Sequence, residues 1–428
     1  MKDIKILKGN IIYTEMPDTF TTLKNGYVIV EDGAVKECCE YLSKKYKNIP
    51  ITDYKDKLII PGLNDMHCHA SQFKHTGLGM DKELVPWLFS HTFPEEKRFK
   101  DLKYAEQTYK NFINEIWKNG TTRSSVWGTL HKEPTELLID LFLKSGLGAY
   151  VSKVNMDANT PEFLDEDTDS SLRETEEMIE KYLGKSQLVK PIITPRFIPT
   201  SSKELLKGLS KLSEKYSIPV QSHLSENLSE IDWVKELYPN SENYGSVYDL
   251  FGLFGQRPTL MAHCIHSDIE ERTLMKKRGV FAVHCPTSNL NLGSGIMPIR
   301  KFMDEGIPVA LGTDIGAGET CSMLRVMVSA IQMSKLAWMD SDKKLKFLST
   351  SEAFYLATKG GGSFFGKVGS FEKGYEFDAL IVDDSCFDMS SYPLEQRIQK
   401  FIYNGDDRNI IHRYVSGDLV KEPFPKSI

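Results

Sequence analysis

The sequence has few cysteines and no paired cysteine motif. Seven cysteines, an odd number, are scattered among the 428 residues, and no C-x-x-C spacing occurs. A disulfide framework is therefore disfavoured, and zinc sites of the P-C-x-x-C type are excluded. The opening residues 1–5 lack the apolar core of a secretory signal. Because unpaired cysteines suit a reducing compartment, we predict a cytoplasmic location.

Long apolar runs and blocks of positive charge are also missing. No apolar stretch approaches the length that spans a bilayer, so no membrane partner is expected. The net charge is −6 and no long basic block occurs, so nucleic acid is not an expected partner either. G-x-S-x-G and H-E-x-x-H are absent, which leaves a serine hydrolase or a zincin without support.

A repeated alternation of segments organises most of the chain. From about residue 60, short apolar segments alternate with amphipathic ones, which favours a parallel sheet with helices between its strands. The strand before His67 brings the number of strands to eight and predicts an α/β fold with a (β/α)8 TIM-like barrel. The predicted helices span roughly 97–118, 133–145, 172–184, 203–216, 268–278 and 320–336. The other predicted strands span 120–127, 148–156, 190–197, 218–224, 259–263, 279–284 and 308–313.

The two ends of the chain share a different pattern. Residues 1–59 have the composition of short strands and turns, with a hairpin signal at Asp32-Gly33, and similar short strands return after about residue 365. Chain termini often lie close together. We therefore predict one small β-sandwich domain built from residues 1–59 and 366–428, with the barrel inserted between them over residues 60–365.

Metal-compatible side chains stand at the ends of several predicted strands. His67 and His69 form H-x-H, and residues two apart on a strand point to the same face, so both imidazoles can reach one ion. His223 adds a third nitrogen, and Asp314 adds an oxygen ligand or a group that orients a bound water. H-x-H alone also fits a chance match or core histidines. The whole set, in barrel order, predicts a metal site at the mouth of the barrel.

Two further residues are placed to move protons or to stabilise charge. Glu226 lies three residues after His223, where a carboxylate beside a metal-bound water can shuttle a proton. The alternative for Glu226 is an acid in the first turn of a helix. His263 ends a strand and can polarise the atom under attack, whereas His266 lies in the following loop. We assign the catalytic role to His263 and expect His284 to be part of the pocket wall.

Several segments resemble the amidohydrolase superfamily and, within it, the deaminase branch. Pro61–His69 looks like the first metal motif of that superfamily. Ala262–Cys264, Cys285–Leu290 and Leu311–Asp314 look like segments of the deaminase branch. The resemblance spans almost the whole chain, because Gly374–Leu380 is similar to the β domain that superfamily members carry, apart from Phe377-Asp378 in place of the usual Ala-Asp.

The resemblance implies a single catalytic metal ion. Binuclear members of the superfamily have a bridging carboxylated lysine at a strand end, and no lysine stands at the end of Ile192–Arg196. Zn²⁺ suits nitrogen and carboxylate ligands, and Fe²⁺ fits similar ones. The implied ligands are His67, His69, His223 and Asp314.

The resemblance also implies a small-molecule purine substrate. Gln72 and Arg196 would hydrogen-bond to the edge of the base, and an aromatic face such as Phe197 would stack on the ring, with Trp87 in the same pocket. Taken singly, a helix-cap glutamine, a surface ion-pair arginine and a core phenylalanine are equally good interpretations. The match of several segments together favours the substrate-binding one.

The implied reaction is the hydrolytic deamination of guanine to xanthine and ammonia. Our hypothesis is that Glu226 and Asp314 accept the proton of the activated water, Glu226 protonates ring nitrogen N3, and His263 stabilises the tetrahedral centre. The alternatives are an enzyme that acts on another purine or a triazine, and a catalytically inactive scaffold. We also expect a homodimer, because dimers are the commonest symmetric assembly.

Overall fold

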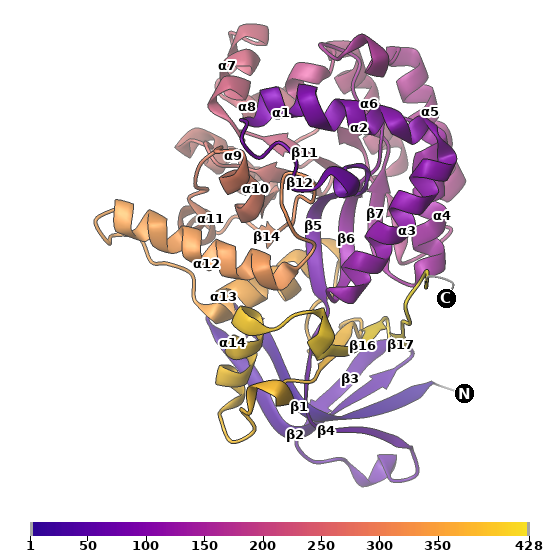
Figure 1. Cartoon of the computed structure of the whole chain (residues 1–428), viewed down its shortest axis with the longest axis vertical. Helices are drawn as coiled ribbons and strands as arrows, with labels where there is room; N and C mark the ends of the chain where they lie inside the picture. The colour runs from indigo at the N-terminus through magenta and orange to yellow at the C-terminus, as the bar shows by residue number, and fades with distance from the viewer. Residues whose placement is uncertain (1–2, 426–428) are drawn as a thin grey trace.

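The computed structural model describes residues 3–425 and has two parts, a helix-covered barrel and a smaller sheet (Figure 1). Strands from both ends of the chain belong to the smaller sheet, so the barrel is inserted between them in the sequence. Both the barrel and the separate sheet from the chain ends were predicted from the sequence and are confirmed. The domain boundaries at residues 59–60 and 365–366 stay a prediction.

The barrel consists of two parallel four-stranded sheets. The first has the order β5 (Leu63–His69), β6 (Thr121–Trp127), β7 (Gly148–Ser152) and β9 (Val189–Pro191). The second has the order β11 (Val220–Leu224), β12 (Thr259–His263), β13 (Phe281–His284) and β14 (Val309–Leu311). A parallel bridge between Ile193 and Val220 joins the two sheets on one side. The predicted strand 190–197 is divided because Pro191 and Pro195 lack the N–H that a continuous ladder needs.

The seam between β14 and β5 closes the barrel on the other side. The Asp314 N–H donates to the His67 carbonyl at 2.8 Å. Asp65 is fully buried and accepts hydrogen bonds from the Thr313 N–H at 2.9 Å and the Thr313 hydroxyl at 2.5 Å. Gly312 is required here because a Cβ would lie 2.8 Å from Cβ of His67. The seam therefore fixes Asp314 against His67 by backbone and side-chain bonds.

The helices follow the predicted strand–helix alternation with shifted ends. The predicted helix over 97–118 is interrupted, because Asp101 caps a new helix by accepting hydrogen bonds from the backbone N–H groups of Lys103 and Tyr104. The helices are α1 (Leu84–Trp87), α2 (Phe93–Lys97), α3 (Leu102–Lys118), α4 (Lys132–Ser145), α5 (Thr168–Tyr182), α6 (Lys203–Tyr216), α7 (Leu228–Leu237), α8 (Tyr244–Leu250), α9 (Ile269–Arg278), α10 (Pro286–Asn291), α11 (Ile299–Glu305), α12 (Met323–Asp340), α13 (Thr350–Tyr355) and α14 (Leu394–Asn404).

The chain ends form one seven-stranded sheet and one helix that the sequence analysis missed. The strand order is β17 (Asp418–Leu419), β16 (Ile410–Val415), β15 (Ala379–Val382), β4 (Ile51–Pro61), β1 (Ile4–Met16), β2 (Thr19–Glu31) and β3 (Ala34–Cys39). The predicted hairpin at Asp32-Gly33 is confirmed by the pairing of Glu31 with Ala34. The missed helix α14 buries Leu394, Ile398, Phe401 and Ile402.

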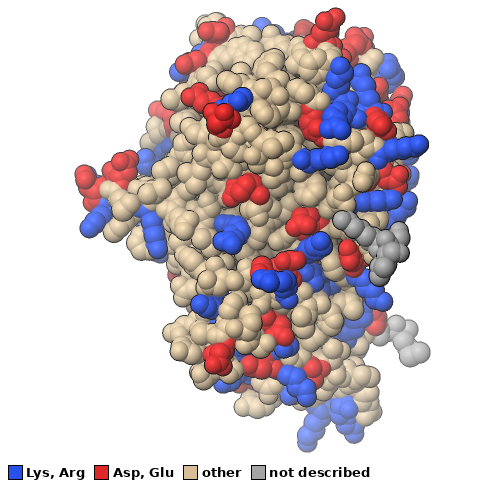
Figure 2. Space-filling view, viewed as in Figure 1, with Lys and Arg blue, Asp and Glu red and all other residues tan. Residues whose placement is uncertain are grey.

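A buried ion pair connects the sheet to the barrel. Arg123 on β6 donates to Asp378 through Nε at 2.6 Å and to Glu376 through Nη2 at 2.6 Å. On the face shown in Figure 2, acidic and basic side chains are interspersed among the described residues. Within residues 3–425, no helix is both long enough and apolar enough to cross a membrane.

Candidate metal and substrate site

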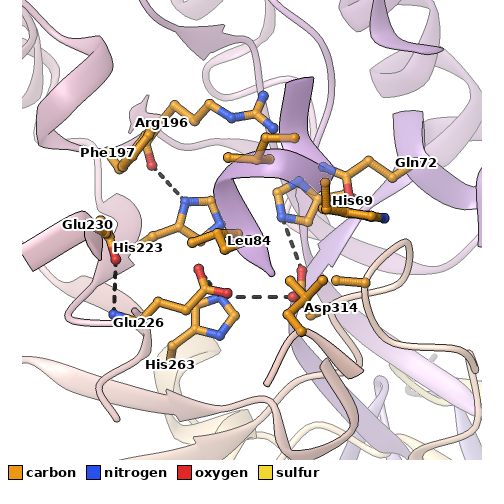
Figure 3. Close-up of a pocket in the computed structure, with 14 residues that line it drawn as sticks. His69, Gln72, Leu84, Arg196, Phe197, His223, Glu226, Glu230, His263 and Asp314 are labelled. Carbon is orange, nitrogen blue, oxygen red and sulfur yellow. Dashed lines mark hydrogen bonds and ion pairs between the residues drawn. The ribbon is translucent and has the colours of Figure 1, made fainter. Parts of the chain in front are cut away.

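The four implied metal ligands come from the ends of three barrel strands and approach one another at the mouth of the barrel, where Figure 3 shows His69, His223 and Asp314. The Nε2 atoms of His67 and His69 lie 3.2 Å apart, and each lies 3.2 Å from Oδ1 of Asp314. His223 lies beside them, with its ring centroid 5.0 Å from that of His67. All the implied metal ligands therefore come together, although their role as ligands stays a prediction.

Hydrogen bonds on the far side of the rings orient two of the histidines. Nδ1 of His223 lies 2.7 Å from the Arg196 carbonyl, which can only accept, so Nδ1 carries the proton and Nε2 carries a lone pair. Nδ1 of His263 lies 2.9 Å from the Asn289 side-chain oxygen, which gives His263 the same tautomer. Trp127 packs against His223 with a centroid distance of 4.3 Å and restricts its rotation.

The electrostatics of the cluster favour neutral imidazoles and a charged carboxylate. Burial lowers the pKa values of His67 and His69 below the usual range, and burial with the neighbouring imidazoles lowers the pKa of His223 further. Burial acts to raise the pKa of Asp314, but the adjacent His67 and His69 hold it well below the usual range. Several nitrogen lone pairs therefore meet one carboxylate in a dry environment.

The donor set fits a divalent metal ion. The 3.2 Å spacing of the His67 and His69 Nε2 atoms is close to the roughly 3.3 Å that two ligands have around a tetrahedral ion at about 2.0–2.1 Å. Two neutral imidazoles that present lone pairs to each other repel without a cation between them. The ligand atoms of His67, His69 and Asp314 lie within 4.8 Å of one another, and so do those of His67, His223 and His263. Residues of these two groups could hold Zn²⁺ or Fe²⁺.

Glu226 follows β11 and projects into the same cavity. Its side chain is buried, and its Oε2 lies 3.4 Å from Nε2 of His263. Burial, helped by the nearby Glu230 and Asp314 charges, raises the pKa of Glu226 well above its usual range. Burial therefore favours the protonated form of this carboxyl, and a group that accepts and returns protons is well served by a raised pKa. The alternative position in the first helical turn is not observed, because α7 begins at Leu228 with Asn227 as its cap.

Strained backbone turns aim these side chains into the cavity. Ser225, His263 and Asp314 have φ values of 47°, 74° and 48°, in the left-handed region that residues other than glycine seldom occupy. Each turn stands at the end of a barrel strand, where it redirects the chain beside the cavity. Such strain concentrates at functional sites, where the surrounding structure holds it in place.

The predicted substrate-binding residues line the same cavity. Arg196 and Phe197 follow β10 (Thr194–Pro195), Gln72 lies in the turn after β5, and Trp87 ends α1. Trp87 also donates from its indole nitrogen to the Leu78 carbonyl at 2.9 Å, so its ring is fixed at the wall. The cavity is lined by His69, Gln72, Leu84, Trp87, Leu88, Arg196, Phe197, His223, Glu226, Glu230, His263, Leu292, Asp314 and Ala317.

Two buried carboxylates of the site were not found by sequence analysis. Glu230 lines the cavity and accepts hydrogen bonds from the Glu226 N–H at 3.1 Å and from the Asn227 N–H at 3.3 Å, and the second of these caps α7 next to the predicted shuttle. Glu96 is 1% exposed and accepts hydrogen bonds from both Arg196 and Gln72. A capping pattern of Asn227 followed by Glu230 could have indicated the first. No sequence signal marks the second.

Two other histidines lie outside the cluster. The prediction that His284 is part of the pocket wall is wrong, because its ring is fully enclosed in the barrel core and does not line the cavity. His266 bonds through Nε2 to the Ser294 carbonyl at 2.8 Å and does not line the cavity. The choice of His263 over His266 therefore agrees with the geometry, since only His263 approaches Glu226 and Asp314.

Sequence and structure comparisons place the chain in a family. The chain belongs to the amidohydrolase family, whose sequence profile matches residues 58–420. Within it, the chain is similar to guanine deaminases. That of Dictyostelium discoideum is 38% identical over 98% of this chain and 99% of that protein, and that of Escherichia coli is 35% identical over 95% and 94%. A crystal structure of guanine deaminase from C. acetobutylicum, with guanine bound in the active site, is 57% identical with a TM-score of 0.97 and covers 98% of this chain and 100% of that one.

Proposed function

We propose that this protein is a metal-dependent guanine deaminase that hydrolyses guanine to xanthine and ammonia. The observation that carries the proposal is the convergence of three histidines, Asp314 and Glu226 on one cavity, in a chain 57% identical to a guanine-bound deaminase. A catalytically inactive scaffold is disfavoured because each implied ligand is present and lies close to the others. Release of ammonia from a free base makes the reaction a step of purine catabolism.

A single Zn²⁺, with Fe²⁺ as the alternative, would be held by His67, His69, His223 and Asp314. When bound at such a site, the ion lowers the pKa of a coordinated water toward neutrality. The support is the donor set, with three neutral imidazoles, one charged carboxylate and a 3.2 Å spacing between the ligand atoms of His67 and His69. No lysine stands at the end of residues 192–196, which favours one ion over two.

The residues opposite the cluster would bind and orient the purine. The Arg196 guanidinium and the Gln72 amide would hydrogen-bond to the edge of the base, and Phe197 would cover its face, with Trp87 closing the wall. These four side chains line the cavity and are almost fully buried, so the ring would be separated from bulk water. Such positioning would place C2 of guanine toward the histidine cluster.

Proton transfers would be carried by Glu226. Water adds to C2, and Glu226 accepts a proton from it, with Asp314 as a second acceptor. Glu226 then donates to ring nitrogen N3, and His263 stabilises the charge at the tetrahedral centre. A second proton delivered to the amino group releases ammonia and leaves xanthine. The raised pKa of Glu226 and its 3.4 Å approach to His263 support these roles.

An ammonia-release screen tests the proposed function. The protein, reconstituted with Zn²⁺ or with Fe²⁺, is assayed against guanine, adenine, adenosine, cytosine and a chlorinated aminotriazine. We expect guanine to be the preferred substrate by at least about 100-fold in kcat/KM, as pockets built around polar groups discriminate. Preferred turnover of another purine or of the triazine would instead support the alternative enzyme, and no turnover with either metal would support the scaffold.

We further propose a cytoplasmic homodimer. All seven cysteines are free thiols, which suits a reducing compartment. Two-fold dimers are the commonest symmetric assembly of soluble enzymes. Light scattering of the purified protein measures the mass directly, and a single species of 48.6 kDa would contradict the dimer.

A further inference from the structure

The buried carboxylate of Glu96 joins the two side chains proposed to hydrogen-bond to the purine. Glu96 lies on α2, next to the α1 segment that gives Trp87 to the cavity wall. Its Oε2 accepts a hydrogen bond from Nη1 of Arg196 at 2.8 Å, and its Oε1 accepts one from Nε2 of Gln72 at 3.3 Å. The Phe93 ring lies 5.0 Å from the Arg196 guanidinium and holds its other side. Arg196 and Gln72 are thus held as one unit.

The chemistry of a carboxylate decides which atoms this unit turns toward the cavity. A carboxylate accepts hydrogen bonds and cannot donate them, so Gln72 must turn its amide nitrogen toward Glu96. Its carbonyl oxygen accepts no bond from any residue between 3 and 425. Beyond Nη1, the Arg196 guanidinium likewise donates to no described residue. Because both side chains line the cavity, a fixed acceptor stands beside fixed donors.

We propose that Glu96 is a positioning residue that makes the site specific for a ring with an N–H next to a C=O. The inference rests on the proposed function and deepens it. Guanine has this pair at N1 and C6, where the N–H would meet the Gln72 oxygen and the C=O would meet Arg196. A purine with an unprotonated N1 would set two acceptors against each other, with an unfavourable loss of pairing for both buried groups.

The side chain of Glu96 also matters through its charge. Arg196 is 2% exposed, so its charge without a partner would be costly to bury. The ion pair with Glu96 neutralises it, and the cavity can then receive an uncharged base. Glu96→Gln keeps the shape but gives position 96 an N–H. That N–H can donate to the Gln72 oxygen, so the Gln72 amide can turn around and the fixed polarity is lost.

Two substrates and a neighbouring variant test the proposal. Guanine has the N1–H and C6=O pair, whereas 2-aminopurine keeps the C2 amine but lacks the pair. In Glu96→Gln we expect kcat/KM for guanine to fall about 10- to 100-fold and that for 2-aminopurine to change by less than about 3-fold. The control is Glu95→Gln. Glu95 is also buried and ion-paired, but with Arg98 at 3.1 Å, and it does not line the cavity. This variant should leave the ratio of the two substrates unchanged.

Measuring ligand binding tests the role of Glu96 without relying on turnover. Calorimetric Kd values are measured for hypoxanthine, which has the pair, and for unsubstituted purine, which lacks it. We expect Glu96→Gln to raise the Kd for hypoxanthine at least about 10-fold and to leave the Kd for purine unchanged. If Glu96→Gln does not fold, Gln72→Met removes the amide instead. This variant should likewise reduce the preference for hypoxanthine over purine, measured as the ratio of their Kd values. Equal losses for both ligands, or no loss for either, would overturn the role of Glu96. A wild-type enzyme that binds hypoxanthine but does not deaminate guanine would instead overturn the proposed function.

Discussion

The two walls of the cavity are built in different ways. One wall, called the metal-binding wall because it contains the predicted metal ligands, has side chains at the ends of barrel strands, held by the seam of Asp65 and Thr313 and by rings such as Trp127. The recognition wall combines a turn, the short helices α1 and α2 and the residues after β10 around the Glu96–Arg196 ion pair. The strand ends thus carry the groups predicted to perform the reaction, while the irregular segments carry the groups predicted to select the ring.

Removing a ligand from the metal-binding wall should have the largest effect. In His223→Ala we expect metal content to fall below about one tenth of an equivalent and kcat/KM to fall at least about 1,000-fold, because the ion activates the water. Atomic absorption and steady-state rates measure both. The control is His266→Ala, whose ring bonds to the Ser294 carbonyl and should leave both quantities near the wild-type values. Full metal content in His223→Ala would contradict the ligand assignment.

Replacing Glu226, the proposed proton shuttle, should lower the turnover rate without removing the metal. Glu226→Gln keeps the shape of the side chain but cannot accept and return a proton. We expect metal content to stay near one equivalent while kcat falls about 10²- to 10⁴-fold, as is usual for loss of a general acid and base. Turnover close to the wild-type rate would remove Glu226 from the mechanism.

Substitutions in the recognition wall should mainly change the affinity for the substrate. Phe197→Ala removes an aromatic face that lines the cavity, and we expect KM for guanine to rise about 5- to 50-fold, with a smaller change in kcat. Phe197→Leu, which keeps apolar volume without the π-face, should lie between the wild type and Phe197→Ala. A loss of metal in either variant would show that the two walls are not separable.

The smallest effect is expected far from both walls, at an ion pair of the terminal sheet. Hydrogen bonds from Lys57 and Ser385 lower the pKa of Asp383 to about 2, below the roughly 3.9 of an unfolded chain. This pair stabilises the fold above about pH 4, and its contribution is lost as pH falls toward 2. Because the pair is partly exposed, Asp383→Asn should reduce the acid-induced loss in the free energy of unfolding by less than about 1 kcal/mol, as measured by urea unfolding. KM and metal content should be unchanged. An equally steep acid response in the variant would contradict it.

How many residues of each wall could be predicted from the sequence depends on whether their contacts are local or long-range. His67, His69, His223, His263 and Asp314 could be found because each stands at the end of an apolar strand, and parallel strands bring such ends to one rim. Glu96 could not be found, because its partners lie 24 and 100 residues away and only the packing of α2 brings them together. His284 also ends a strand, yet its ring is buried and does not line the cavity. Position at a strand end therefore does not by itself distinguish a residue of the rim from one of the interior.

The terminal sheet shows the same division. The hairpin at Asp32-Gly33 is local, since two residues with positive φ are enough to reverse the chain, and it was predicted correctly. Helix α14 was missed because its apolar stripe of Leu394, Ile398, Phe401 and Ile402 lies among short strands. The pairing of β15 with β4 joins segments from opposite ends of the chain and is visible only in the fold.

The amino-acid sequence by itself determined the barrel and the order of the metal-compatible residues, because periodicity and strand-end positions are local features of the chain. The class of reaction came from the resemblance of several segments to the amidohydrolase superfamily. Only the tertiary structure decided which histidines meet, which tautomers they adopt and how Gln72 turns its amide. Those properties depend on the Arg196 carbonyl, Asn289 and Glu96, which reach the site through long-range packing. A hydrogen bond fixes polarity only when both of its partners are in place.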